Sequence, residues 1–285
     1  MVSRIRNSIL LAAAAIVLVT AAQAATQPLS LYRLGAVGYA GESVERSTRL
    51  LAGYLASGLR AEVRVQLFAR YDDILAALEK KELELAILPP VVFLVAEEKA
   101  GVKPLANPVY QSGDTNYRSV ILTLPGRADL TQLLDLKMKK VAFVDPHSAS
   151  GYIIPHGMLH QAGLAGKRDV REVFTGNHVK SIEALIAGEV DAAATYDMLL
   201  VQTPALGKSL EDFSVLARSD PIPSEVLVGA RDLPEGQAVW IRSLLSAFGK
   251  LRESDHKYES CVYQWFYPHD PTRYEQLRKL WKAGR

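Results

Sequence analysis

Cysteine is almost absent from this sequence: Cys261 is the only one in 285 residues. One thiol cannot close an internal disulfide, so even an oxidising compartment would add no covalent cross-link. Stability must therefore come from an apolar core, which a hydrophobic content of 49% can supply. Tyr258, Tyr263, Trp265 and Phe266 surround Cys261 in the sequence, and these apolar neighbours favour a buried structural thiol over a reactive one.

The sequence also lacks a strong excess of charge, because its formal net charge is only +2. Two of its positive charges, Arg4 and Arg6, lie in the first residues, so the rest of the chain is close to neutral. Nothing here indicates a nucleic-acid partner or an anionic membrane surface. A bound anion would have to be held by local geometry and not by a general positive field. Internal repeats, low-complexity tracts and linker-like segments are absent as well.

A long apolar run occurs once, at residues 9–20, directly after Arg4 and Arg6. Ala22-Gln23-Ala24 then matches the small-x-small cleavage pattern, which predicts a secretory signal peptide over residues 1–24. The alternative is a membrane anchor, but a spanning helix needs about 20 apolar residues, and this run is shorter. Since no cysteine follows the cleavage site to take a lipid, we expect a free periplasmic protein.

The remaining chain alternates apolar strand-like runs with amphipathic helical stretches, the pattern of an α/β fold in which helices cover parallel sheets. The expected strands are residues 30–37, 61–68, 85–88, 118–124, 140–144, 192–195, 215–217 and 226–229. The expected helices are 43–59, 71–81, 129–136, 151–161 and 181–187, with helices dominating from 236 to the end. Pro155 is tolerable only near the first turn of its helix.

The layout predicts two α/β lobes, the second inserted into the first. The first lobe comprises residues 25–117 and 220–285, and the second comprises 118–219. The chain would cross between them near Tyr117 and again near Asp220. Ligands in such sheets bind beyond the carboxyl ends of the strands, so the cleft between the lobes is the expected site.

One segment, DPHSASG at residues 145–151, carries the most chemical information. A strand runs into a turn rich in hydroxyl groups and then into a helix, whose first backbone N–H groups lack partners and carry partial positive charge. Ser148 and Ser150 would add hydroxyl donors, forming an uncharged cradle for an anion. The alternative is an ordinary N-cap, a position at which serine is favoured in any case.

Four collinear segments decide between these interpretations. They are DPHSASG, TGNHVKSIEALIAGEVDAAATYD, ARYDDILAALEKKELELAIL and SDPIP. Together they resemble the periplasmic phosphonate/phosphite/phosphate-binding family of ABC importers, and the resemblance spans residues 31–234. It implies a type II periplasmic-binding-protein fold with mostly parallel sheets. It also implies a monomeric solute-binding protein, not an enzyme, that needs no cofactor and delivers a small oxyanion to an ABC permease in the inner membrane.

The resemblance also implies a role for each matching residue. The expected ligand-binding residues are Tyr71, Tyr117, Ser148, Ala149, Ser150, His178 and Tyr196. The two tyrosines Tyr71 and Tyr117 would donate phenolic hydroxyls, and His178 would donate from the start of a helix. Neutral donors suffice because hydrogen bonds to an ionised partner are about twice as strong as neutral ones.

Three departures from the family pattern affect ligand choice. Ala149 stands where a threonine is common, which removes one hydroxyl but keeps the backbone N–H. Pro89-Pro90 replaces a common Gly-Pro. Tyr196 stands where an acidic residue often lines the cleft, and such an acid would suit a ligand amine. The sequence therefore supports recognition of the anionic head more strongly than recognition of its tail.

Other classes of function were weighed. His156 and His160 are four residues apart on a predicted helix and His147 lies just before it, which allows a zinc site, but no third ligand is fixed by spacing. Hydrolysis by Ser148 with His178 as the base is disfavoured, because no G-x-S-x-G elbow surrounds Ser148 or Ser150. A sensory protein that presents a bound anion to a receptor kinase stays open, since it would use the same closed form.

Overall fold

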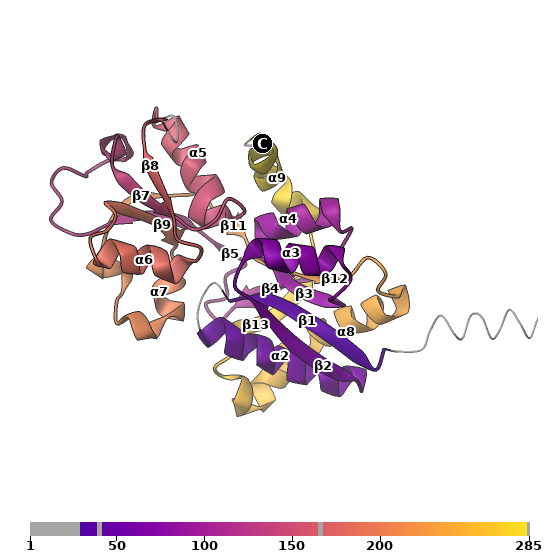
Figure 1. The fold of residues 1–285 in the computed structure, drawn as a ribbon. Coiled ribbons are helices and arrows are strands. Elements are labelled where there is room, and N and C mark those ends of the chain that lie inside the picture. Colours follow the sequence, from indigo (N-terminus) through magenta and orange to yellow (C-terminus); the bar gives the residue numbers. More distant parts are fainter. Residues whose placement is uncertain (1–28, 39–41, 165–167, 284–285) are drawn as a thin grey trace, which may run out of the picture.

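The computed structural model describes residues 29–38, 42–164 and 168–283. Two lobes lie side by side, each a sheet covered by helices, with a short two-stranded sheet between them (Figure 1). The predicted signal peptide falls outside the described residues. Within the described ranges, no helix has the length and apolar character needed to cross a membrane.

The first lobe is built on a six-stranded sheet with the order β13-β4-β12-β3-β1-β2. Helices α2 and α8 cover one face, and α3, α4 and α9 cover the other. Cys261 lies in the core under α8, with an exposed fraction of 0%. The strands are β1 (Leu31–Val37), β2 (Glu62–Phe68), β3 (Leu85–Leu88), β4 (Lys103–Tyr110), β12 (Val226–Gly229) and β13 (Tyr263–Pro268), and the helices are α2 (Glu42–Leu59), α3 (Tyr71–Glu79), α4 (Pro90–Lys99), α8 (Glu235–Ser254) and α9 (Glu275–Ala283).

This sheet is mixed, whereas the sequence predicted mostly parallel sheets. β1 runs parallel to β2 and β3, but β12 is antiparallel to both of its neighbours, β3 and β4. β12 is the strand that returns from the second lobe, so it enters the sheet from the opposite end. Helices α8 and α9 dominate the chain after residue 236, as expected, but the aromatic run Tyr263–Pro268 between them forms β13 and pairs with β4. Aromatic residues fit the pleated surface of a strand well.

The second lobe contains a five-stranded sheet with the order β10-β6-β9-β7-β8, also mixed. Helix α6 packs on one face and α5 on the other. The strands are β6 (Ser119–Thr123), β7 (Lys140–Phe143), β8 (Arg171–Phe174), β9 (Ala192–Tyr196) and β10 (Ser214–Arg218), and the helices are α5 (Ile154–Gln161), α6 (His178–Ile186) and α7 (Leu199–Gln202).

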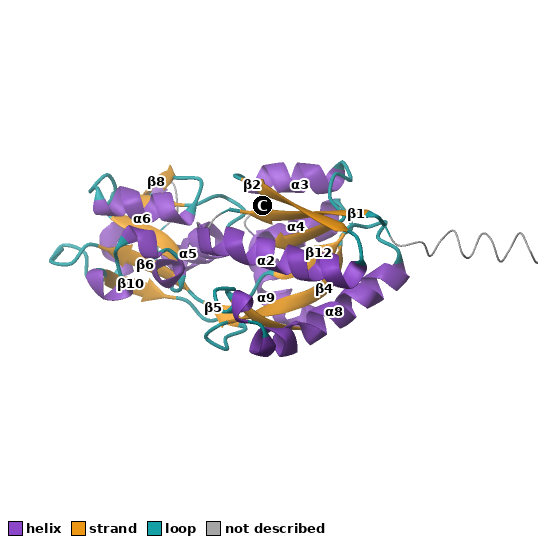
Figure 2. Cartoon of the chain, turned by 90° about the horizontal axis from the view of Figure 1, so that it is seen from below, coloured by secondary structure: helices purple, strands orange, loops and turns teal. Residues whose placement is uncertain are grey.

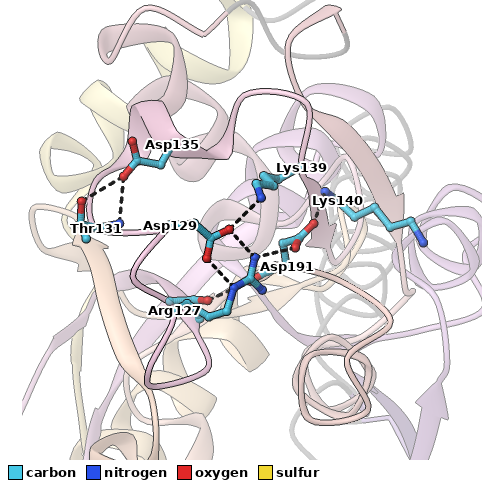
Figure 3. A network of polar contacts seen from close by, with 8 residues as sticks. Arg127, Asp129, Thr131, Asp135, Lys139, Lys140 and Asp191 are labelled. Atoms are coloured by element: carbon cyan, nitrogen blue, oxygen red, sulfur yellow. Dashed lines mark hydrogen bonds and ion pairs between the residues drawn. The ribbon is translucent and has the colours of Figure 1, made fainter.

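The helix expected over residues 129–136 does not form, apart from one 3₁₀ turn at Leu133–Leu136. The Asp135 carboxylate accepts hydrogen bonds from the backbone N–H of Thr131 and Gln132, at 2.9 and 3.0 Å. Such side-chain bonds offer the backbone an alternative to the helical pattern. Figure 3 shows this loop held by a polar network in which Arg127 bridges Asp129 and Asp191.

The lobes are joined by two crossing segments that pair with each other. β5 (Asn116–Tyr117) and β11 (Ile222–Pro223) form a two-stranded antiparallel sheet, which lies between the two groups of elements in Figure 2. The Arg273 side chain holds the first crossing through the Asn116 amide oxygen, at 2.7 Å. Ser219 on the return crossing accepts from the backbone N–H of Ser119, at 3.0 Å.

Candidate functional site

The segment after β7 folds into the hydroxyl-lined turn that the sequence predicted. The Asp145 carboxylate accepts from the backbone N–H of His147 at 2.7 Å, which tightens the turn. The Ser148 hydroxyl then accepts from the backbone N–H of Gly151 at 3.0 Å and caps the helical segment. The two interpretations of this segment are therefore compatible. Ser148 is an N-cap, and the cap places Ser148 and Ser150 at the helix tip, where a cradle for an anion would lie.

This helical segment begins with a π-helical turn at Ala149–Ile153, before α5. The backbone N–H of Ile153 bonds to the Ser148 carbonyl, five residues back, at 2.9 Å. Pro155 has no N–H to donate, so it fits at the start of α5 as expected. π-helical turns are rare and occur frequently at functional sites. The wide turn keeps Ser148, Ala149 and Ser150 together at the carboxyl end of β7.

The next helix in the same lobe supplies His178, the first residue of α6. Burial lowers the pKa of His178 to about 3, so its imidazole is neutral near pH 7. Its Nδ1 lies 3.0 Å from the Thr195 hydroxyl and its Nε2 lies 3.5 Å from the Ser148 hydroxyl. If Thr195 donates to Nδ1, the ring proton sits on Nε2 and points to the cradle. A neutral imidazole can thus donate one hydrogen bond there.

Three tyrosines approach the cradle from different elements. Tyr71 begins α3 of the first lobe and hydrogen-bonds Ser148, whereas Tyr117 on the crossing strand hydrogen-bonds Ser150. Tyr196 ends β9 and packs edge-on against His178, with ring centroids 4.8 Å apart. Burial raises the pKa of all three phenols above the usual value of 10. They therefore keep their protons and can act as hydrogen-bond donors.

All seven residues expected from the sequence line one pocket between the lobes, with a cavity of about 30 Å³. A single water needs about 10–15 Å³, so this cavity accepts only a small group. Val144 and Ala149, which follow β7, share a hydrophobic cluster with Tyr71 of α3. The lining residues are Val44, Tyr71, Pro89, Pro90, Tyr110, Tyr117, Ser148, Ala149, Ser150, His178, Tyr196, Met198, Glu225, Val262 and Tyr263.

Sequence reasoning missed the acidic group of this pocket. The position expected to carry an acid holds Tyr196, but Glu225 reaches the cavity from the other side, just before β12. The Tyr110 hydroxyl lies 3.5 Å from its carboxylate. Burial raises the pKa of Glu225 to about 8, so its carboxyl group holds a proton near pH 7. Glu225 lies two residues after the SDPIP crossing, and that proximity was the one signal for it in the sequence.

The raised pKa of Glu225 predicts a pH dependence of stability. An exposed glutamate has a pKa of about 4.3, so between about pH 4.5 and 8 the folded protein binds one proton more than the unfolded chain. The free energy of unfolding then falls as pH rises, by up to about 1.4 kcal/mol per pH unit. Glu225→Gln removes this contribution to the pH dependence of the free energy of unfolding.

Urea denaturation of wild type and Glu225→Gln at pH 5.5, 6.5 and 7.5 measures the difference. We expect wild type to lose stability relative to the variant with each step. Glu79→Gln, at an exposed position at the end of α3, is the matched control and should follow wild type. Parallel profiles for wild type and Glu225→Gln would show that Glu225 is not buried as a neutral acid.

The zinc interpretation gains no support from the side chains. His156 lies 3.6 Å from the Glu172 carboxylate, and His147 lies near Asp72 and Asp145. Over residues 29–38, 42–164 and 168–283, no three His, Cys, Asp or Glu side chains gather closely enough to hold a metal ion. His156 and His160 share a helix but find no third ligand there.

The fold is that of a type II periplasmic binding protein, in which each lobe has a mixed β-sheet covered by helices. The predicted α/β fold class is confirmed. The model of one family, the phosphonate periplasmic substrate-binding proteins of ABC transporters, matches residues 38–274. The chain belongs to this family. Its members bind and deliver substrates and are not enzymes, as the sequence predicted.

Individual relatives agree with this assignment. A curated relative, the phosphate-import protein PhnD of Mycolicibacterium smegmatis, is 28% identical over 142 residues, covering 47% of this chain and 44% of that protein. The chain thus matches less than half the length of that relative. A binding-protein component of an ABC phosphonate transporter from Pseudomonas aeruginosa has a TM-score of 0.78 at 17% identity, covering 88% of this chain and 85% of the other. PhnD1 of Prochlorococcus marinus, solved with methylphosphonate, has a TM-score of 0.75 at 18% identity, covering 90% and 98%.

Proposed function

We propose that this protein captures a small tetrahedral oxyanion, a phosphonate, phosphite or phosphate, in the periplasm and delivers it to an ABC permease of the inner membrane. One observation carries the proposal: seven predicted ligand-binding residues from both lobes line one small cavity. Hydroxyls of Ser148 and Ser150, the helix-tip N–H groups and neutral His178 all offer donors there. This set stabilises an anion without a formal positive charge.

The lobe boundaries give the proposed mechanism. The first lobe comprises residues 25–117 and 220–285, the second comprises 118–219, and the β5–β11 pair is the hinge. The cradle belongs to the second lobe, whereas Tyr71 belongs to the first. A ligand that contacts both lobes favours the closed form by its differential affinity for that form. The permease would then recognise the closed protein.

The size of the cavity limits the substituent that the bound anion can carry. At about 30 Å³, it favours a compact ligand such as phosphite or methylphosphonate over one with a long substituent. Glu225 holds its proton near pH 7, so an ammonium tail would have to displace that proton before it gained an ion pair. We therefore expect simple oxyanions to bind more tightly than amino-phosphonates.

A thermal-denaturation panel tests the function. Phosphate, phosphite, methylphosphonate, 2-aminoethylphosphonate and methanesulfonate are compared at equal concentration, with Zn²⁺ as a control. A ligand at 100 times its dissociation constant stabilises by about 2.7 kcal/mol, which raises Tm by several degrees in a protein of this size. A shift with a phosphorus oxyanion is expected. Stabilisation by Zn²⁺ alone, or by none of these, would refute the proposal.

A sensory role with the same ligand is the second candidate. It predicts the same panel result, because a receptor kinase and a permease would both read the closed form. The neighbouring genes separate the two: permease and ATPase genes support transport, and a receptor-kinase gene supports sensing. Membership of a transporter family favours transport.

A further inference from the structure

Glu225 reaches the pocket from a two-residue link, Ser224–Glu225, which joins β11 to β12. The pairing of β12 with β4 starts at Leu227, opposite Ala106. Two residues earlier, the same register would place Glu225 opposite Pro108, and proline has no N–H to donate. The backbone of β4 therefore cannot hold the Glu225 carbonyl.

A side chain of β4 bonds the link instead. The Asn107 amide nitrogen donates to the Glu225 carbonyl at 2.7 Å and to the Tyr274 hydroxyl at 2.5 Å. The Tyr274 hydroxyl in turn donates to the Ser224 carbonyl at 2.6 Å. Both carbonyls of the Ser224–Glu225 link are thus held by side chains, one from β4 and one from the turn before α9.

This network has one arrangement that satisfies its members. The Asn107 amide oxygen lies 2.9 Å from His269 Nδ1, so it can accept from the imidazole while the amide nitrogen donates to the Glu225 carbonyl. A rotated amide would set its oxygen against that carbonyl oxygen, which cannot donate. Asn107, Ser224 and Tyr274 are at most 1% exposed. Buried polar networks that are fully satisfied rigidify the structure around them.

The side chain of Glu225 faces the pocket. Its carboxyl group lies 3.5 Å from the Tyr110 hydroxyl and beside Tyr263, and all three residues line the cavity. Burial raises the pKa of both phenols, so they are neutral near pH 7. Burial is also the main cause of the raised pKa of Glu225. Displacing the link would expose the carboxyl group to water and lower that pKa.

We propose that Asn107 and Tyr274 are positioning residues that fix Glu225 in the pocket wall and so control which substituent the bound anion can carry. Neither residue lines the cavity, so both act through Glu225. The consequence for the ligand rests on the proposed function. A fixed link keeps the carboxyl group buried and neutral, which offers no ion pair to an ammonium tail, whereas a displaced link lets it ionise.

Tyr274→Phe tests the positioning role while keeping the aromatic ring. It removes the hydroxyl that holds the Ser224 carbonyl, so some stability is lost whether or not that hydroxyl positions Glu225. The informative readout is the pH dependence of the free energy of unfolding, from urea denaturation at pH 5.5, 6.5 and 7.5. We expect a shallower fall with rising pH than in wild type, because a Glu225 carboxyl group that ionises at lower pH reduces the difference in bound protons.

Tyr32→Phe is the matched control. The Tyr32 hydroxyl donates to Gln237 Oε1 at 2.9 Å in the buried core of the same lobe, and Tyr32 does not line the cavity. This variant should also lose stability but keep the wild-type pH dependence. If Tyr274→Phe keeps it too, the network is only structural and the proposal is refuted.

Calorimetry at pH 7 gives a second readout, the dissociation constant of 2-aminoethylphosphonate divided by that of methylphosphonate. Tyr274→Phe should lower this ratio by about two- to fivefold, the worth of a partly exposed ion pair. In the Glu225→Gln background the side chain cannot ionise, so adding Tyr274→Phe should leave the ratio unchanged. An equal fall in both backgrounds would show that Tyr274 does not act through Glu225.

The two readouts separate failure of this inference from failure of the proposed function. The pH dependence of unfolding needs no ligand, so a wild-type slope in Tyr274→Phe refutes the positioning role even if oxyanions bind. If neither phosphonate binds wild type but the slope becomes shallower, the proposed function fails and the positioning of Glu225 stands.

Discussion

Ser150→Ala should weaken binding of methylphosphonate or phosphate by about ten- to a hundredfold. The Ser150 hydroxyl is buried at the helix tip beside Tyr117. Losing one hydrogen bond to a charged partner costs about 1.5–3 kcal/mol, and each 1.4 kcal/mol is tenfold in affinity. Isothermal titration calorimetry measures the change directly.

The fold should tolerate this substitution. The Ser150 backbone carbonyl accepts from the Ser119 hydroxyl at 2.8 Å, and alanine keeps that carbonyl and loses only the side-chain contact with Tyr117. Tm without ligand should therefore fall by no more than a few degrees. Ser246→Ala, on the exposed face of α8, is the matched control for both measurements. Wild-type affinity in Ser150→Ala would remove this hydroxyl from the site.

Gly151→Ala should damage both the fold and the site. A Cβ atom at Gly151 would lie 2.4 Å from the Val144 side chain and 2.8 Å from the Ser148 hydroxyl. Both distances are too short, so the turn must move. Forcing an extra methyl into a packed position costs about 1–3 kcal/mol, and here the displaced atoms belong to the cradle. We expect Tm to fall by several degrees and affinity to fall by more than tenfold.

Gly157→Ala provides the comparison for this prediction. Gly157 lies on α5, and a Cβ atom added there meets nothing within 4 Å. Alanine favours a helix over glycine by about 1 kcal/mol, so Tm should hold or rise and affinity should be unchanged. Thermal denaturation and calorimetry of the two variants together are decisive. Equal behaviour of Gly151→Ala and Gly157→Ala would show that the π-helical turn has room that the structure does not indicate.

The cradle could be predicted from the sequence because its chemistry is local. Ser148 and Ser150 follow a strand and begin a helix, and this arrangement alone brings hydroxyls and free N–H groups together. His178 begins a helix after a strand of the same sheet, but it was named only through the family resemblance, because the helix expected there starts at residue 181. The side chains that meet them across the pocket, Tyr71 and Tyr117, could be named only through the family resemblance, since nothing in their own segments points to a cleft.

Glu225 escaped prediction for a physical reason. It lies just before β12, and the start of that strand meets the pocket because β12 returns antiparallel from the second lobe. An alternating α/β pattern predicts parallel strands and gives no sign of that reversal. The loop at 129–136 failed differently: its apolar spacing fits a helix, but the Asp135 carboxylate competes for the backbone N–H groups.

The solitary thiol of Cys261 gives the chain a native probe of its own folding. The sulfur is fully buried in the first lobe, and the second lobe has no cysteine in its sequence. A thiol reagent can therefore react only when the core beneath α8 and β13 opens. Its labelling rate under native conditions reports the free energy of that opening. Unfolding of one lobe can thus be timed separately from the other without adding a label or changing a residue.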